Sequence, residues 1–551
     1  MTKTLEPIAR RQAGRSALLA AWAASGLLTG CGAPDVAPTE RNPSFELRAV
    51  VPIGSPFHGV HGLRFDADDR LYAVSVIGQS LFTVDVDSGR VETLIGPPQG
   101  MGDDIAIAAD GTFVWTAIED GILYARAPGG PIRRVLEGYK GVNAVAFGPD
   151  GRRLFLSLVF YGDALYEVDL YGNSPPRLIA ENIGGLNAFE VGSDGMIYGP
   201  LVFGAAVVKI DPDTGDIETI SDDFVSAGAL KLESDTSALV LDDGEAIKRV
   251  DLTSGATTLV ARLPAGADNL AIDSTGRVFV SLSENNAIVE LDPETGAISY
   301  AVEPAPLTSP AGFAVDARGG DTLIVGDLFG GIKTIDVATG RIGQAKVELF
   351  QPSRISLDGD TVLGVSQVFG TIQRFALGDF SVLDTWEGFM LPGEVLPAPD
   401  GGLIVADAGS GRVLRVAPGG GSEFEALAAG LQMPTGLAPA GDDAVYVSET
   451  GAGRVLRVAL ADGGTQEIAS GLGQPEGIAV AADGHLLVVD VAAREIVEID
   501  PVSGSRSTLA GELPIGLANG PSLYRDIATS GGRIYFNSDV DNTIYELVES
   551  E

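Results

Sequence analysis

The chain has 551 residues, and 36 basic against 75 acidic side chains give it a net charge of −39. So acidic a surface repels phosphate backbones and excludes nucleic acid as the main partner. One cysteine excludes an intramolecular disulfide and cysteine-based zinc sites, and three histidines argue against a three-histidine metal centre. The length favours two domains, and 73 glycines spread through the sequence indicate many tight turns and an all-β fold.

The first thirty residues are typical of a targeting segment. A basic stretch from Lys3 to Arg15 precedes the apolar run 16–28, whose 13 residues are too few to span a bilayer. The run ends in Leu28-Thr29-Gly30-Cys31, which resembles a lipobox. An ordinary secretory signal with an incidental Cys31 is the alternative.

We therefore expect a lipoprotein signal peptide over 1–30 and a lipidated Cys31 that anchors the chain to a bacterial envelope membrane. Residues 31–44 are polar and rich in proline, which predicts a flexible tether. Gly32 follows the cysteine directly. An aspartate at this position would favour retention in the inner membrane, so the glycine favours the outer membrane or cell surface as the location.

One pattern recurs along the rest of the chain. An apolar run is followed by Asp-Gly, a strand, a second strand ending in Asp, and then Thr-Gly or Ser-Gly. Ile478–Asp490 shows the first half of the pattern and Ile288–Gly296 the second. Asp-Gly pairs suit two-residue hairpin turns, so each unit predicts a set of short antiparallel strands.

The units repeat every 40 to 49 residues. The residues just before each first strand are His61, Asp103, Asn143, Asn187, Gly228, Asp268, Ala311, Ser353, Gly393, Thr435, Glu476 and Arg525. Twelve such units predict twelve four-stranded β-propeller blades, and no Trp-Asp signature accompanies them. Since one ring usually holds four to eight blades, we expect two tandem six-bladed β-propellers.

The expected rings span 45–296 and 297–551. Residues 45–51 form an extra strand before the first unit, and we expect this strand to close the first ring. We expect 297–302 to complete the last blade, at 527–548. One large ring, or a strand exchanged between the rings, is the alternative.

Residues that precede the innermost strands converge near a propeller axis. In the first ring these are His61, Asp103, Asn143, Asn187, Gly228 and the pair Asp268-Asn269, a set rich in carboxylate and amide oxygens. Such oxygens are the ligands of Ca²⁺. A turn role at any single position is the alternative, but the second ring offers only Glu476 among its acids and amides. The first ring therefore predicts a metal site.

The stretches Gly141–Phe147, Gly185–Phe189 and Gly266–Asp273 resemble the six-bladed propellers of the senescence marker protein/gluconolactonase family and of the paraoxonases. The resemblance covers roughly residues 50–300. It implies that Asn143, Asn187, Asp268 and Asn269 hold a catalytic Ca²⁺, or another divalent ion.

The sequence departs from that family at two positions. His61 replaces the first-blade glutamate, and Asp103 stands where paraoxonases have a histidine. Asp103 then supplies the missing carboxylate ligand and His61 is free for acid–base work. A changed metal or a decayed site is the alternative.

Other signals have structural explanations. Asp211–Asp216 resembles the start of an EF-hand loop but falls at the repeat turn. His485 lies in an expected surface turn, and the second ring resembles NHL-type repeats without a recognisable site. The aromatic residues Phe160, Tyr161 and Phe203 either line a substrate mouth or pack within blades.

Two functions remain open. In the first, the first ring is a metal-dependent lactone or ester hydrolase in which Asp268 or Asp103 acts as base and His61 assists proton transfer. In the second, the chain is a lipid-anchored scaffold that binds an envelope protein or glycan. Neither the substrate nor the oligomeric state follows from the sequence.

Overall fold

The computed structural model describes residues 45–329, 331–345, 351–367, 369–517 and 525–550. Its strands form twelve four-stranded antiparallel sheets, as the repeats predict. Short 3-10 turns, η2 (Ser283–Asn285) and η3 (Thr450–Ala452), interrupt two hairpins. In this described part of the chain, no helix is both long and apolar enough to cross a membrane. The predicted signal peptide, Cys31 and tether lie outside the described residues.

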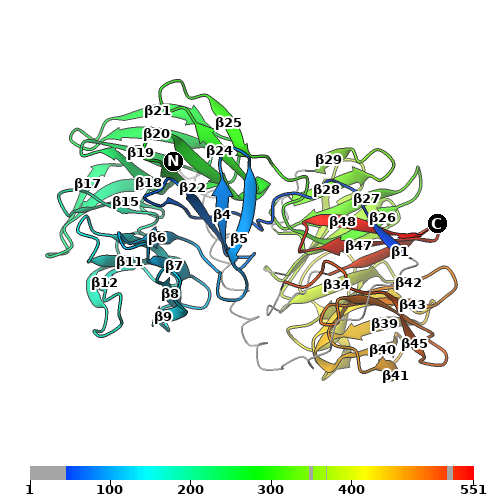
Figure 1. The fold of residues 1–551 in the computed structure, drawn as a ribbon. Coiled ribbons are helices and arrows are strands. Elements are labelled where there is room, and N and C mark those ends of the chain that lie inside the picture. Colours follow the sequence, from blue (N-terminus) through cyan, green and yellow to red (C-terminus); the bar gives the residue numbers. More distant parts are fainter. Residues whose placement is uncertain (1–44, 330, 346–350, 368, 518–524, 551) are drawn as a thin grey trace. The chain divides into compact units, whose positions relative to one another are not determined.

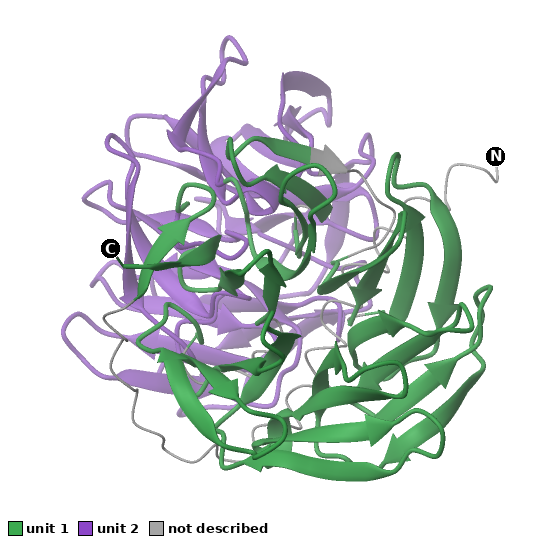
Figure 2. Cartoon of the chain, turned by 90° about the vertical axis from the view of Figure 1, so that its right-hand side faces the viewer, with its two compact units in different colours: residues 1–54, 306–551 green, residues 55–305 purple. Residues whose placement is uncertain are grey.

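The chain divides into two compact units, which Figure 2 colours separately. Residues 55–305 form one unit, here called the first ring. Its six innermost strands neighbour one another in a closed circle: β2, β6, β10, β14, β18 and β22. Its sheets comprise β2 (Leu63–Phe65), β3 (Leu71–Ser75), β4 (Ser80–Asp85) and β5 (Arg90–Ile95); β6 (Ile105–Ile107), β7 (Phe113–Ala117), β8 (Ile122–Arg126) and β9 (Ile132–Leu136); β10 (Val142–Phe147), β11 (Leu154–Leu158), β12 (Ala164–Val168) and β13 (Arg177–Glu181); β14 (Glu190–Val191), β15 (Ile197–Leu201), β16 (Ala206–Ile210) and β17 (Ile217–Ser221); β18 (Ala227–Ser234), β19 (Ser237–Asp242), β20 (Ala246–Asp251) and β21 (Thr257–Arg262); and β22 (Ala267–Ile272), β23 (Val278–Leu282), β24 (Ala287–Leu291) and β25 (Ile298–Val302).

The remaining described residues form the second ring. Its innermost strands β26, β30, β34, β38, β42 and β46 also close a circle. Its sheets comprise β26 (Pro310–Asp316), β27 (Thr322–Asp327), β28 (Gly331–Asp336) and β29 (Ile342–Ala345); β30 (Arg354–Asp358), β31 (Thr361–Ser366), β32 (Thr371–Ala376) and β33 (Val382–Glu387); β34 (Pro392–Pro397), β35 (Leu403–Asp407), β36 (Arg412–Val416) and β37 (Phe424–Ala429); β38 (Pro434–Pro439), β39 (Ala444–Glu449), β40 (Arg454–Ala459) and β41 (Thr465–Ser470); β42 (Pro475–Val480), β43 (Leu486–Asp490), β44 (Glu495–Ile499) and β45 (Arg506–Ala510); and β46 (Ile527–Ser530), β47 (Arg533–Ser538), β48 (Thr543–Glu549) and β1 (Phe45–Ala49).

The strand β1 closes the second ring, so the expectation that it closes the first ring is wrong. It pairs antiparallel with β48, from Phe45 opposite Glu549 to Ala49 opposite Tyr545. Figure 1 shows this blue strand beside the red strands β47 and β48. The first ring is thus inserted between β1 and β26, which corresponds to the alternative in which a strand is exchanged between the rings.

The strand β25 belongs to the first ring, so the expectation that 297–302 completes the last blade is also wrong. It pairs with β24, with Ile298 opposite Leu291. The turn that joins them is the repeat turn, in which Oδ1 of Asp292 accepts the amides of Glu294 and Thr295 at 2.9 and 3.1 Å. This local hairpin forms with little loop-closure cost, and the first ring therefore extends to residue 305 rather than 296.

The same turn explains the EF-hand-like segment. Oδ1 of Asp211 accepts the amides of Asp213 and Thr214 at 2.8 and 3.4 Å, as Asp292 does in its own turn. The repeated aspartate therefore satisfies turn amides in both blades.

The cores lie between neighbouring blades. In one cluster, Ala144 and Phe155 from one blade contact Phe189 and Ile197 from the next. Small residues let the innermost strands approach closely. A Cβ atom on Gly62 would lie 2.7 Å from the carbonyl oxygen of Asp103, so the junction of the first two blades requires glycine there.

Candidate functional site

The six first-ring axial residues (His61, Asp103, Asn143, Asn187, Gly228 and Asp268) precede or begin innermost strands. His61, Asp103 and Asn187 hold equivalent backbone positions, since each donates its amide to the neighbouring second-strand segment: to Val74, Thr116 and Pro200, at 2.8 to 3.1 Å.

β-Bulges set the direction of two of these side chains. The pairing of β10 with β11 shifts between Val142 and Val145, which places Asn143 inside the irregularity. The pairing of β22 with β23 shifts between Ala267 and Leu270, around Asp268. Bulges re-aim side chains and are common beside functional sites.

His61 and Asp268 come together across the junction of the first and sixth blades. Nδ1 of His61 lies 3.4 Å from Oδ2 of Asp268, and the side chains keep 16% and 27% of their exposure. Asp268 is therefore partly open to solvent, whereas Nε2 of His61 is buried. A carboxylate beside Nδ1 orients an imidazole and leaves Nε2 directed away from the carboxylate.

The two axial asparagines offer amide oxygens. Asn143 is buried, and its Oδ1 has no hydrogen-bond partner within the described residues. Nδ2 of Asn187 donates to the carbonyl oxygen of Gly228 at 3.0 Å, which leaves its Oδ1 for another group. A buried acceptor without a donor is costly, and a cation would satisfy it.

Other polar groups at this level support the fold. Oδ1 of Asn269 accepts the amide of Leu270 at 2.8 Å. The buried Asp104 accepts the amide of Val145 at 3.1 Å and so joins two neighbouring blades. Burial raises the pKa of Asp104.

The oxygen atoms of the axial side chains fit a divalent cation only in part. The unpartnered Oδ1 of Asn143 suits a cation, whereas Asn269 already uses its oxygen on an amide. In the described part of the chain, the ligand atoms of Asp103, His61 and Asp268 do not all lie within 4.8 Å of one another.

Glu119 is an acid that the sequence analysis missed. It follows strand β7, and Oε2 of Glu119 accepts the hydroxyl of Tyr161 at 3.1 Å. Burial, with a smaller contribution from the charge of Asp103, raises the pKa of Glu119 to about 7. A carboxyl group poised near neutral pH can donate or accept a proton. The sequence pattern that could have identified this residue is Glu119-Asp120-Gly121, which places an acid at the turn after the second strand of a blade.

Two aromatic side chains lie next to this turn region. Phe160 and Phe203 pack edge to face at 5.8 Å between ring centroids, and Phe203 is 43% exposed. Their contact is compatible both with packing between blades and with a place at a mouth, and it does not decide between the two.

A buried ion-pair network lies further along the inner strands. Nη1 of Arg64 and Nζ of Lys231 lie 3.1 and 3.4 Å from Oε1 of Glu190. Burial alone would raise the pKa of Glu190, but the charges of Lys231 and Arg64 outweigh it and lower the pKa. A cavity of about 320 Å³ opens beside Arg64 and Glu190, lined also by Ser193 and Asp235. These residues lie at or beyond the middle of the inner strands, so this cavity is distinct from the axial site.

The second ring buries an unexpected set of charges. Arg354, Glu394 and Asp526 stand one position after the residues that the sequence analysis singled out, and all are at least 90% buried. Nε of Arg354 lies 3.8 Å from Oε2 of Glu394. Burial and the charge of Asp526 raise the pKa of Glu394 to about 8.

Glu476 and Arg525 belong to the same set. Oε2 of Glu476 accepts the amide of Arg525 at 2.9 Å, and burial raises the pKa of Glu476 to about 8. Nε of Arg525 lies 3.5 Å from Oδ2 of Asp539. Asp526 accepts the amides of Phe313 and Ile527, so these charged groups also join neighbouring blades.

Comparison with known proteins supports the fold. No protein-family profile and no curated protein sequence matches the chain. Among solved structures, a GH74 xyloglucanase from Xanthomonas campestris matches 92% of this chain and all of its own, at 14% identity and a TM-score of 0.51. A catalytically inactive virginiamycin B lyase from Staphylococcus aureus, with quinupristin, matches 59% of this chain and 97% of its own, at 14% identity and a TM-score of 0.37. The chain is a double β-propeller protein: its two rings hold six blades each.

Proposed function

We propose that the first ring is a divalent-metal-dependent hydrolase of lactones or esters. The carrying observation is the pair formed by Nδ1 of His61 and Oδ2 of Asp268, 3.4 Å apart at the axial end of the inner strands, with Asp268 partly open to solvent. A carboxylate beside an imidazole can pass on to it a proton taken from an attacking water.

Five of the six axial residues have a role in this proposal. Oδ1 of Asn143, Oδ1 of Asn187 and the carboxylates of Asp268 and Asp103 would hold Ca²⁺ or a similar ion. That ion, when bound, supplies Lewis acidity toward the substrate carbonyl. Asp268 keeps the His61 ring in place; the carboxylate of Asp268 or Asp103 would accept a proton from the attacking water, and His61 would assist its transfer. Glu119, whose pKa is raised to about 7, can return a proton to the leaving alcohol.

We further propose that the protein acts at the bacterial envelope. The lipobox at Cys31 would attach it to a membrane through acyl chains, with the outer membrane or cell surface favoured. The propellers would then face substrates or partners outside the cytoplasm.

A second candidate function is a scaffold without catalysis. Asn269 and Asp104 use their oxygens on backbone amides, which is what a structural role predicts. In that case any metal is structural, and the exposed Phe203 contributes to a surface for an envelope protein or glycan.

A hydrolysis screen separates the two functions. Purified protein is tested on a panel of lactones and aryl esters, after chelation and after calcium is restored. The hydrolase predicts calcium-dependent turnover that falls about 10²-fold or more in His61→Gln. The exposed Asp222→Asn in the same ring is the control and should keep full activity. Absence of turnover on the whole panel, or equal turnover in His61→Gln, would favour the scaffold.

A further inference from the structure

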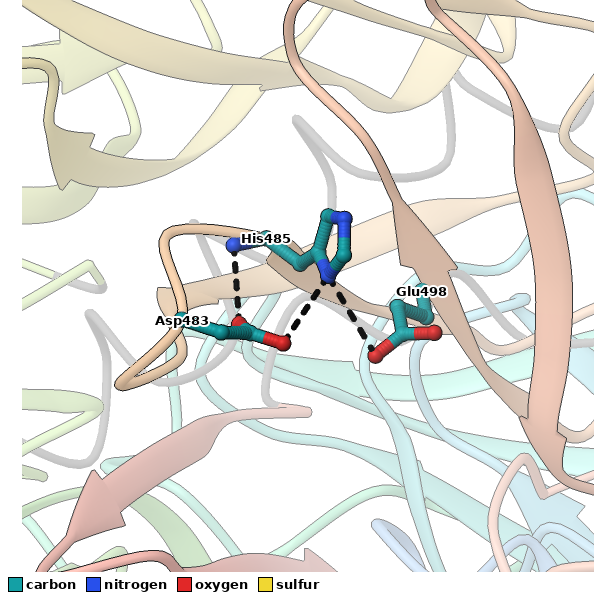
Figure 3. A group of neighbouring side chains, drawn as sticks. All are labelled: Asp483, His485 and Glu498. Carbon is teal, nitrogen blue, oxygen red and sulfur yellow. Dashed lines mark hydrogen bonds and ion pairs between the residues drawn. The ribbon is translucent and has the colours of Figure 1, made fainter.

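A three-residue cluster on the second ring has the composition of a transition-metal site. Asp483 and His485 flank Gly484 in the hairpin between β42 and β43, and Glu498 lies on the adjacent strand β44. Figure 3 shows both carboxylates directed at the same nitrogen of the imidazole. Nδ1 of His485 lies 3.0 Å from Oδ2 of Asp483 and 3.8 Å from Oε1 of Glu498.

These separations match those between ligands of a bound zinc ion. Tetrahedral zinc with bonds of about 2.0 to 2.2 Å holds neighbouring ligand atoms about 3.3 to 3.6 Å apart. The two measured distances bracket this range, and one ligand atom from each residue lies within 4.8 Å of the others. Coordination would therefore need only small changes in the distance from His485 to each carboxylate, with the two carboxylate oxygens at most 4.8 Å apart and water completing the shell.

The equivalent position in two other blades holds an arginine instead. Arg153 and Arg277 also directly precede a second strand, and each places Nε 2.8 Å from a glutamate oxygen, of Glu167 and Glu290. Glu167, Glu290 and Glu498 all pair with the second residue of that strand. The blade with His485 thus keeps the glutamate and replaces the guanidinium with an imidazole.

This replacement removes a permanent positive charge from the site. Within the described part of the chain, no lysine or arginine forms an ion pair with Asp483 or Glu498. Two carboxylates then face one imidazole, which is charged only when protonated, whereas in the blade with Arg277 the permanent charge of arginine faces Glu290, Asp273 and Asp87. A divalent cation would supply the missing charge.

We propose that Asp483, His485 and Glu498 form a binding site for Zn²⁺ or a similar borderline transition-metal ion, independent of the first-ring site. One nitrogen and two carboxylate oxygens suit such an ion better than Ca²⁺ or Mg²⁺, which prefer oxygen ligands alone. The side chains keep 59%, 38% and 33% of their exposure, so the ion can enter from solvent. The bound ion would link the hairpin between β42 and β43 to strand β44.

The test uses Zn²⁺ and Co²⁺ with the full chain. Equilibrium dialysis with elemental analysis measures binding, and the visible spectrum of Co²⁺ reports its ligands. The wild type should bind Zn²⁺, excess Ca²⁺ should not displace it, and the Asn143→Ala/Asp268→Ala variant should bind equally well. His485→Arg copies the arginine–glutamate pair of the other blades, so it should fold normally and bind Zn²⁺ at least about tenfold more weakly. No Zn²⁺ binding by the wild type, or unchanged binding by a folded His485→Arg, would overturn the proposal.

Discussion

The substitution Glu119→Gln isolates the electrostatic cost of the buried acid in the first ring. The glutamine carbonyl can still accept the hydroxyl of Tyr161, so the change removes mainly the ionisation. Because burial raises the folded-state pKa from 4.5 to about 7, the wild type loses stability as pH rises from the unfolded pKa through the folded pKa. Above about pH 7 both states are ionised and the loss is complete.

The size of this effect follows from the shift. At about 1.4 kcal/mol per pKa unit, the stability of the wild type relative to Glu119→Gln should fall by about 2.5 kcal/mol between pH 5 and pH 8. For a ring of this size, that corresponds to about 5 to 10 °C in melting temperature.

Calorimetry at several pH values measures the effect on the first ring's transition. The difference between Glu119→Gln and the wild type should grow from pH 5 to pH 8. A matched variant of an exposed acid in the same ring, Glu218→Gln, should follow the wild type at every pH. Parallel curves for Glu119→Gln and the wild type would refute the assignment of a raised pKa to Glu119.

Three further predictions concern closure, buried charge and the axial acceptor. Deletion of 45–49 should lower the melting temperature of the second ring and leave that of the first, because β1 pairs only with β48; limited proteolysis of each ring checks this. Arg354→Met removes a buried cation from beside Glu394 and Asp526 and should cost about 3 to 5 kcal/mol in denaturant unfolding. Asn143→Leu removes an unpartnered acceptor, so it should be near neutral without metal and should abolish any rise of the melting temperature by calcium.

The repeat spacing predicted all twelve blades, because each blade is built from local hairpins. Turn aspartates such as Asp211 and Asp292 are readable in the sequence, since their side chains bond amides two or three residues away. Ring closure was predicted wrongly, because 45–51 and 297–302 are both short alternating strands that carry no information about a distant partner. The hairpin from β24 to β25 is local, so β25 joins the first ring, which leaves β1 for β48.

The candidate site was predictable in position but not in detail. Spacing placed His61 and Asp268 at the ends of innermost strands, and the ring brings them within 3.4 Å. Bulges at the start of β10 and β22 set the direction of Asn143 and Asp268, and spacing does not reveal a bulge. The repeat spacing singled out the residues just before Arg354, Glu394 and Asp526, and these three buried charges were therefore missed.

Calcium content tests the central claim, a first-ring metal site, most directly. Elemental analysis of the wild type and of the Asn143→Ala/Asp268→Ala variant, after dialysis against buffered calcium, measures the occupancy. The first-ring site predicts one equivalent of calcium in the wild type and its loss in a folded double variant. Calcium absent from both proteins, or equally present in both, would contradict it.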